Sequence, residues 1–599
     1  QNGSQYRSLM FKTGATERFR IASDGSLSTP TAGTSNVRFG VNAGNSIASG
    51  GIDNTVVGDE AGTAITTGRF NTLIGKEAGD ALNDADSNVA IGKGALSSDT
   101  QGSQSTAIGT LALTAQNFTS ATDAYNVAVG AEAGAAVTTG TFNTLIGGLA
   151  GDAITTGIRN TTVGHQSLSS NTTGGLNTAL GRSALLSNTT ASNNTAVGYE
   201  ALYANTTGAN NVAVGNYALD ANTTGGENTA VGYQSLSSAT TVDNNTAFGY
   251  TALRDNTSGS SNLAVGVNTL RLNTTASNNT GVGAFALDVN TTGASNTALG
   301  SAALGANTTA ANNTAVGHAS LAANTTGDRN VAVGTEALDA NTTSDGNTAV
   351  GYRALTTNTT AEINTAIGFQ ALALTTTGPA NTALGSNSLY SNTTGTNNVA
   401  VGYASLTANT TASNNTAVGT SALAANTTGA SNTAVGKEAL TTNATGGDNS
   451  AFGRRALNSN TTGASNTAIG LESLYANTTG ASNVAVGAGA LDANTTAANN
   501  TAVGHASLGA NTTGANNTAL GFSSLSANIS GTLNTAVGRS ALASDTKGNN
   551  SVALGYNTLN AQNFTSATDV YNTAVGYAAG AAVTTGTLNT LLGGLTGDA

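Results

Sequence analysis

The chain contains no Cys, no Trp and only two Pro among its 599 residues, and charged residues make up 8% of it. The absence of Cys fits an oxidising and a reducing compartment equally well. No apolar run approaches the roughly 20 residues of a membrane-spanning helix, so we expect no membrane insertion in this sequence. The formal net charge of −12 provides no basic surface for nucleic acid.

What the chain does have is a short period. A pentad similar to Asn-Thr-Ala-Val-Gly returns every 17 residues, at Asn54, Asn71 and Asn88 and then from Asn126 to Asn534. A repeat this short is too small to be a domain, so each copy must be one coil of a stack. The aliphatic residues are strictly phased, which is not typical of a disordered chain. We therefore expect an elongated fibre or rod and no enzyme.

The layout of one coil predicts its secondary structure. In residues 194–210, NTAVGYEALYANTTGAN, we number the anchor Asn194 as position 0. Positions 1 to 3 form a β-prone run that Gly198 ends, and a second short run is centred on Leu202. The residues from Asn205 onward are typical of a turn. Two short strands and two turns per coil predict an all-β fold, a parallel β-solenoid or β-roll of 17-residue coils.

Three nearly invariant positions predict how the coil packs. Position 2 is almost always Ala (Ala196), position 3 is an aliphatic residue or Phe (Val197), and position 8 is mostly Leu (Leu202). Neighbouring residues of a strand face opposite sides. We expect Val197 and Leu202 to fill the coil, and the side with Ala196 and Gly198 to press against a sister chain. Position 5 varies freely and is expected to face solvent.

A single coil is not expected to be stable. Burial of one Val and one Leu contributes roughly 3–5 kcal/mol, whereas ordering a residue costs about 1–2 kcal/mol. The difference must come from hydrogen bonds between coils, from ladders of identical side chains and from chain association. We expect Asn194 and Asn205 to form amide ladders. Packing of the Ala and Gly side around a fibre axis predicts association with sister chains.

The repeat divides the chain into two parts. Residues 1–35 do not follow the period and are predicted to be a separate β segment. Residues 36–599 form a shaft of about 32 coils, roughly 150 Å long at about 4.8 Å per coil. Two longer coils, 105–125 and 551–571, mark a higher-order repeat of 446 residues. The last coil stops part-way at Ala599, so we expect the natural protein to be longer.

A second type of coil follows each of the longer ones. In residues 126–142 and 143–159, Gly134 and Gly151 occupy position 8, where most coils have Leu; the coils that begin at residues 54, 71, 572 and 589 share this pattern. The aliphatic residue has moved to position 11, as Val137 and Ile154 show.

The two longer coils carry the aromatic residues that are candidates for surface contacts. They are Phe118 and Tyr125 in one insertion and Phe564 and Tyr571 in the other. Aromatic residues on a protruding loop are candidate contacts to a glycan or a protein. The alternative, which we favour, is a loop that packs its own aromatic side chains.

No pattern of residues indicates chemistry. His165, His318 and His505 all lie at position 5 of separate coils, where they alternate with Tyr, Asn and Lys and are expected to face solvent. His and carboxylate residues are never clustered at metal-ligand spacing. We predict no catalytic residue, no metal site and no cofactor.

The pentad and the NTTG turns resemble the head repeats of trimeric autotransporter adhesins, in which a similar motif recurs in a left-handed parallel β-roll. They resemble more closely the NTAVGYxAL arrays of phage tail-fibre-like proteins, where a segment like Glu17–Gly25 often precedes the array. The likeness covers about nine tenths of the chain. It implies an extracellular homotrimeric fibre that contacts a host-surface glycan or protein receptor.

These observations leave three functions open. The leading one is the shaft of a phage or phage-like tail fibre, and the second is a bacterial trimeric surface adhesin. The third is a single-chain solenoid that binds ice or another surface, which flat, exposed rows of Thr would favour. The adjacent Thr residues at positions 12 and 13 would not both face one way, so they do not provide such rows.

Overall fold

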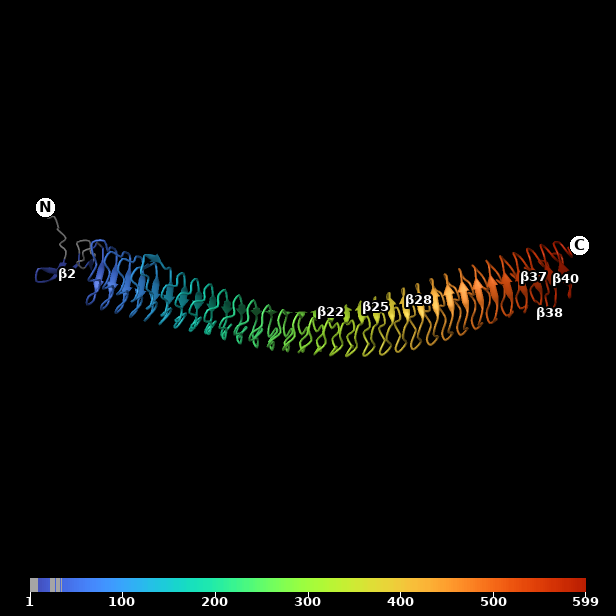
Figure 1. The fold of residues 1–599 in the computed structure, drawn as a ribbon, viewed down its shortest axis with the longest axis horizontal. Coiled ribbons are helices and arrows are strands. Elements are labelled where there is room, and N and C mark those ends of the chain that lie inside the picture. The colour runs from blue at the N-terminus through green and yellow to red at the C-terminus, as the bar shows by residue number, and fades with distance from the viewer. Residues whose placement is uncertain (1–8, 22–26, 29–32, 34, 599) are drawn as a thin grey trace, which may run out of the picture. The chain divides into compact units, whose positions relative to one another are not determined.

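The computed structural model describes residues 9–21, 27–28, 33 and 35–598 (Figure 1). These residues form an all-β parallel solenoid of about 33 coils at 17-residue spacing, and they include no helix. The predicted all-β parallel solenoid of 17-residue coils is therefore confirmed. The chain forms two compact units, residues 1–296 and 297–599, and each is described by itself.

In the first unit, every coil contributes one strand of three residues to a parallel sheet. Strands of consecutive coils pair without a shift, as Thr195 with Val212 and Ala196 with Ala213. The strands are β4 (Val37–Phe39), β5 (Thr55–Val57), β6 (Thr72–Ile74), β7 (Val89–Ile91), β9 (Thr106–Ile108), β11 (Val127–Val129), β12 (Thr144–Ile146), β13 (Thr161–Val163), β14 (Thr178–Leu180), β15 (Thr195–Val197), β16 (Val212–Val214), β17 (Thr229–Val231), β18 (Thr246–Phe248), β19 (Leu263–Val265) and β20 (Thr280–Val282).

The second unit repeats this arrangement, with the strands following one another in chain order along the stack (Figure 1). They are β21 (Thr297–Leu299), β22 (Thr314–Val316), β23 (Val331–Val333), β24 (Thr348–Val350), β25 (Thr365–Ile367), β26 (Thr382–Leu384), β27 (Val399–Val401), β28 (Thr416–Val418), β29 (Thr433–Val435), β30 (Ser450–Phe452), β31 (Thr467–Ile469), β32 (Val484–Val486), β33 (Thr501–Val503), β34 (Thr518–Leu520), β35 (Thr535–Val537), β37 (Val552–Leu554), β39 (Thr573–Val575) and β40 (Thr590–Leu592).

Each ordinary coil has one strand, where the sequence predicts two. The residues around Leu202 form a turn, because Glu200 and Leu202 have φ angles of 52° and 53°. This left-handed conformation does not continue a strand. The turn still stacks on its neighbour, since the N–H of Leu202 donates to the carbonyl oxygen of Ala218 at 2.9 Å. The predicted second strand is therefore wrong, although its backbone is hydrogen-bonded between coils.

The interior of the coil also differs from the expectation. Ala196 and Leu202 are fully buried, whereas Thr195 and Val197 on either side of Ala196 are only half-buried. The strand thus turns Ala inward and its aliphatic residue outward. The expectation that Val197 fills the coil is wrong, and the reason is space. Leu202 already fills the interior, so the strand opposite it has room for a methyl group only.

Gly198 is required by the stack itself. Its φ is 135°, a conformation that favours Gly. A Cβ at this position would lie 2.6 Å from the carbonyl carbon and oxygen of Gly215 in the next coil. The small residues at positions 2 and 4 are therefore explained within one chain. They give no support to the predicted contact between the Ala and Gly side and a sister chain.

In the second type of coil, a small residue at position 8 is compensated by larger buried side chains at other positions. Gly134 has no side chain, and Val137 and Leu145 are fully buried around it. A Cβ on Gly134 would lie 2.6 Å from Cδ1 of Leu145. Removal of the Leu at position 8 thus makes room for larger residues at positions 11 and 2.

Three further strands precede the first coil. β1 (Leu9–Thr13) and β2 (Thr16–Ile21) form an antiparallel hairpin, and β3 (Leu27–Ser28) pairs with β2. The ring of Phe19 contacts those of Phe11 and Phe39, with centroids 5.8 and 5.9 Å apart. Because Phe39 belongs to the first coil, the hairpin packs an aromatic side chain on the outward side of β4.

Candidate functional site

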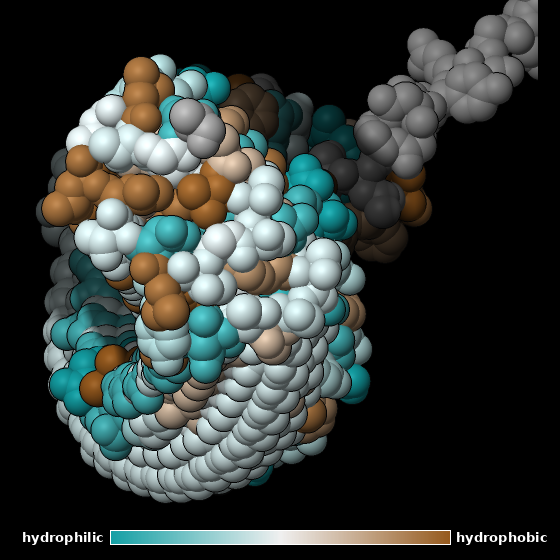
Figure 2. Space-filling view, turned by 90° about the vertical axis from the view of Figure 1, so that its right-hand side faces the viewer, coloured by the Kyte–Doolittle hydropathy of each residue, from teal (hydrophilic) through white to brown (hydrophobic). Residues whose placement is uncertain are grey.

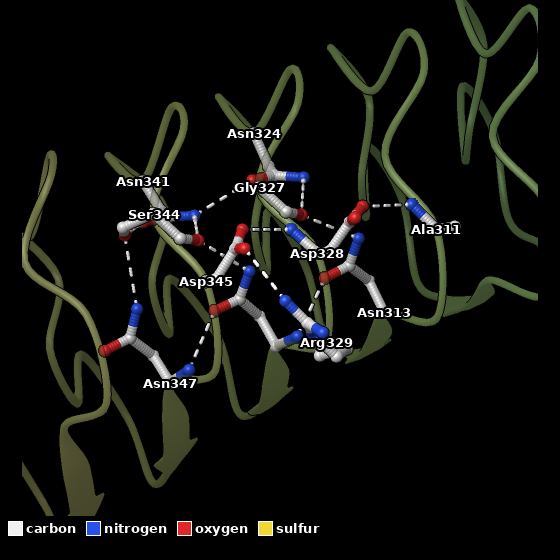
Figure 3. Close-up of polar contacts among 11 residues, drawn as sticks. Ala311, Asn313, Asn324, Gly327, Asp328, Arg329, Asn341, Ser344, Asp345 and Asn347 are labelled. Carbon is white, nitrogen blue, oxygen red and sulfur yellow. Dashed lines mark hydrogen bonds and ion pairs between the residues drawn. The ribbon is translucent and has the colours of Figure 1, made fainter.

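Two ladders of Asn side chains run inside the stack. At position 0, Oδ1 of Asn194 accepts the N–H of Asn211 at 2.9 Å, and its Nδ2 donates to the carbonyl of Gly208 in its own coil. At position 11, Nδ2 of Asn205 donates to Oδ1 of Asn188 at 2.9 Å. The second unit has the same ladders, in which Oδ1 of Asn330 accepts the N–H of Asn347 and Nδ2 of Asn341 donates to Oδ1 of Asn324. Asn324, Asn341 and Asn347 are labelled in Figure 3. These Asn residues are buried and hold consecutive coils together.

A third ladder, at position 15, was not expected from the sequence. Oδ1 of Asp345 accepts the N–H of Asp328 at 2.7 Å, and Oδ1 of Asp328 accepts the N–H of Ala311 at 2.7 Å (Figure 3). Arg329 also donates to Asp345. The signal for this ladder was the recurrence of Asp and Ser at position 15, which resembles ordinary turn composition.

The position 11 ladder is interrupted at three places, and each leaves a buried side-chain oxygen without a partner. The three oxygens are Oδ1 of Asn222, Asn358 and Asn528. In each case the next coil lacks Asn at position 11: Ala239 follows Asn222, Thr375 follows Asn358 and Asp545 follows Asn528. The unpaired oxygens are therefore a direct result of the missing Nδ2 donor.

The two insertions place their aromatic residues differently. Phe118 and Phe564 are 6% and 8% exposed, so their side chains are buried and unavailable for a surface contact. Tyr125 and Tyr571 are 45% and 53% exposed. Each insertion adds a two-residue parallel pairing, β8 (Gly102–Ser103) with β10 (Thr122–Asp123) and β36 (Gly548–Asn549) with β38 (Thr568–Asp569). The Phe residues thus behave as a self-packed loop.

A buried polar network replaces the Asn ladder at each insertion. Nε2 of Gln116 donates to Oδ2 of Asp99 at 2.6 Å and to Oγ of Ser105 at 3.0 Å. Oδ1 of Asp99 accepts the N–H groups of Gly102 and Phe118. Gln562, Asp545 and Ser551 repeat these contacts in the second insertion. The network joins consecutive coils by hydrogen bonds, and it ties the inserted residues to the stack.

The outward side of the sheet is uncharged in every coil. We call the first and third residues of the three-residue strands the outer strand face. The first residue is Thr, Val, Leu or Ser, and the third is Val, Ile, Leu or Phe. Larger third residues are the most exposed, as for Phe248 (54%) and Leu299 (47%). Figure 2, which looks onto the last coil of the second unit, shows side chains lined up in rows behind it.

Aromatic and cationic side chains form stacks at position 5. Tyr233 and Tyr250 stack with centroids 5.5 Å apart, and Tyr556 and Tyr577 at 5.2 Å. The guanidinium of Arg182 lies 5.5 Å from the ring of Tyr199. The expectation of a variable position 5 at the surface agrees with these exposed side chains, which contact one another along the stack.

Position 9 carries half-buried acids. Burial raises the pKa of Asp220 to about 6, and Oδ1 of this residue has no hydrogen-bond partner. Burial also raises the pKa of Asp80, Asp339 and Asp492, which occupy the same position of other coils.

The described residues hold no cluster of three His, Cys, Asp or Glu side chains that is suited to a metal ion. In the same part of the chain, no helix has the length and apolar character to cross a membrane. The candidate functional features are therefore surfaces of the stack: the outer strand face, the position 5 row and the exposed Tyr of the insertions. No family model, no curated protein and no solved structure matches this chain.

Proposed function

We propose that the chain is the shaft of an extracellular attachment fibre in which three copies associate through the outer strand face. The leading assignment is a phage or phage-like tail fibre that contacts a host-surface glycan or protein, and the alternative is a bacterial trimeric surface adhesin. The observation that supports this is the unbroken, uncharged outer strand face in both units. We therefore place the contact between chains on the side of the strand with Val197, because the Ala and Gly side is buried inside the coil.

The size of the face favours a partner. With strands about 4.8 Å apart and two residues about 7 Å apart along the strand, the two units together present roughly 1,100 Å². The apolar third residues make up about half of this area, and soluble monomers rarely expose an apolar patch of more than a few hundred Å². A standard protein interface takes roughly 800 Å² from each partner. The area is therefore sufficient for stable association.

The pattern of the face favours copies of the same chain. A partner without repeats would have to place a complementary group at every coil spacing along the face. A second copy of this chain has the same coil spacing by construction. Within the chain, Phe19 already packs on Phe39, the first aromatic residue of this face. The face is thus apolar enough to be covered by an apolar side chain where one is available.

The native mass of the protein, measured by sedimentation at low concentration, tests this proposal. We expect a trimer that resists dilution. Replacement of Val197, Val214 and Val231 by Lys should yield a monomer, because three copies would bury the charges together. The matched control introduces Lys at Thr207, Thr224 and Thr241, which are exposed in the same coils. This variant should remain trimeric. A wild-type monomer would refute the fibre interface.

One observation favours a second candidate, a single-chain solenoid that binds ice or another ordered surface. The outer strand face carries a row of Thr at its first residue beside a row of aliphatic residues at its third. Thr occupies this position in most coils of the parallel sheet, so these hydroxyls share one face, unlike the pair at positions 12 and 13. A monomeric protein that inhibits ice recrystallisation, and loses this activity with the Lys substitutions, would support the second candidate over the first.

A further inference from the structure

Along position 5, two Phe or Tyr residues are separated by one intervening coil at three places, and the chain fills two of these gaps itself. Between Tyr199 and Tyr233, the ring of Tyr217 inserts edge-on, 5.3 Å from one centroid and 6.3 Å from the other. Between Phe522 and Tyr556, the guanidinium of Arg539 lies 5.5 and 5.8 Å from the two rings. A gap of one coil therefore accommodates a ring or a planar cation.

The third gap, between Phe369 and Tyr403, holds only small side chains. Ser386 occupies position 5 of the intervening coil, and Asn387 occupies the position from which Tyr217 fills its own gap. The three coils are direct neighbours, since the N–H of Asn387 donates to Phe369 and that of Ala404 to Ser386, at 2.9 and 3.0 Å. Two coil spacings place the walls roughly 9.6 Å apart.

The walls of this gap present open aromatic surface. Phe369 and Tyr403 are 49% and 59% exposed. One face of Phe369 is covered by Tyr352, which stacks on it at 5.5 Å with an interplanar angle of 20°. Because this stack runs along the coil axis, the other face of Phe369 is turned toward the coil of Ser386.

The groove beside the gap is polar but uncharged. It is open, has a volume of about 330 Å³ and adjoins Tyr403, and it is lined by Gln370, Asn387, Tyr390, Tyr403, Ala404 and Thr407. Among the described residues, the side-chain amides of Gln370 and Asn387 and the hydroxyls of Tyr390 and Tyr403 make no hydrogen bond. Amide and hydroxyl groups thus flank the Tyr403 wall of the gap, and no carboxylate or cation lines this groove.

We propose that this gap, which we call the Ser386 slot, binds one neutral pyranose residue of a surface glycan. A sugar ring offers C–H groups on its faces to Phe369 and Tyr403, and hydroxyls at its edge to Gln370, Asn387 and Tyr390. A gap of roughly 9.6 Å exceeds the spacing of about 7–8 Å that a planar ring needs when it lies flat between two others, so it also has room for a thicker, saturated ring. A cationic ligand would lack a carboxylate partner. The adjoining groove lies at the lower end of ligand-pocket volumes, which suits a single sugar unit.

This inference rests on the proposed attachment function and names the ligand class of one place on the shaft. Binding of glucose, galactose, mannose and N-acetylglucosamine to the full chain would be measured by saturation-transfer NMR. We expect binding of at least one of them in the millimolar range. Ser386→Tyr, which places a ring between the two walls from position 5, as Arg539 places its guanidinium in its own gap, should reduce binding at least tenfold without lowering the unfolding temperature.

Two further variants complete the test. Tyr403→Ala removes one wall and should also reduce binding, whereas Tyr556→Ala, beside the gap that Arg539 fills, should leave it unchanged. Absence of transfer to every neutral sugar, or binding that Ser386→Tyr leaves intact, would overturn the inference. The native mass separates the two proposals: a trimer without sugar binding refutes only the Ser386 slot, and a monomer with sugar binding refutes only the trimeric fibre.

Discussion

Nδ2 of Asn205 donates a hydrogen bond of 2.9 Å to Oδ1 of Asn188, one coil earlier, and both side chains are fully buried. Nδ2 of Asn205 also donates to the carbonyl of Gly208. One amide thus links two coils and closes a turn in its own coil. A buried polar group without its partner costs about 1–3 kcal/mol, so the interruptions of this ladder are measurable weak points.

Repair of one interruption should stabilise the protein. Thr375→Asn supplies an Nδ2 donor for Oδ1 of Asn358, which has no partner in the present structure. Gly378 follows at position 14, as Gly208 does beside Asn205, so the larger side chain has a precedent. We expect a gain of about 1 kcal/mol in chemical denaturation. Thr377→Asn, at an exposed position of the same turn, is the control and should change nothing.

The Gly that ends each strand should not tolerate a side chain. Gly198→Ala adds a Cβ 2.6 Å from the backbone of Gly215 at a φ of 135°. We expect a loss of at least about 1–3 kcal/mol, because the backbone must shift between two hydrogen-bonded coils. At Gly148 the nearest atom would lie 3.7 Å away and no positive φ is required. If Gly148→Ala were as harmful as Gly198→Ala, close stacking would not be the cause.

The networks at the insertions should depend on the length of Gln. Gln116→Asn shortens the side chain that reaches both Asp99 and Ser105, and so leaves buried groups unpaired. We expect a loss of about 2–4 kcal/mol, measured by denaturation. Gln101→Asn, in the preceding coil, makes the same chemical change on a half-exposed side chain and should have little effect. Equal losses in both variants would contradict the network.

Asp220 should make stability depend on pH. Burial raises its pKa in the folded protein to about 6, above the ordinary value of 3.8. The folded state therefore binds the proton more tightly than the unfolded state, and its contribution to stability is lost as pH rises through this window. Asp220→Asn should raise the unfolding temperature at pH 7 and leave it unchanged below about pH 4. Asp288→Asn should instead destabilise at pH 7, because Asp288 pairs with Arg271 at 2.8 Å.

The period of the sequence was enough to predict a parallel stack, but not which side of the strand faces inward. Alternation allows either Ala196 or Val197 to point into the coil, and the hydrophobic effect alone favours burial of the larger residue. The deciding fact is the volume of Leu202. The sequence held this signal, since Leu73 and Leu145 occupy position 2 only in coils where position 8 is Gly. Residue sizes at positions 2 and 8 are thus coupled across the coil.

Other features depended on geometry that composition does not reveal. The left-handed backbone at Glu200 and Leu202 removed the second strand, although neither residue type favours that conformation. The Ser386 slot was missed because it is defined by what is absent between two rings. The ladder at position 15 was hidden among residues that are common in turns.

The position 11 ladder also has an electrical consequence. Each amide donates toward the preceding coil, as Asn205 does to Asn188 and Asn188 to Asn171. The side-chain dipoles therefore point the same way and add along the stack, like the peptide dipoles of an α-helix. The end of each ladder nearer the N-terminus carries the partial positive charge and the other end the partial negative charge. Residues such as Ala239 interrupt this row of aligned dipoles. The row is therefore a series of shorter dipole arrays, and a single substitution at position 11 sets where each array ends.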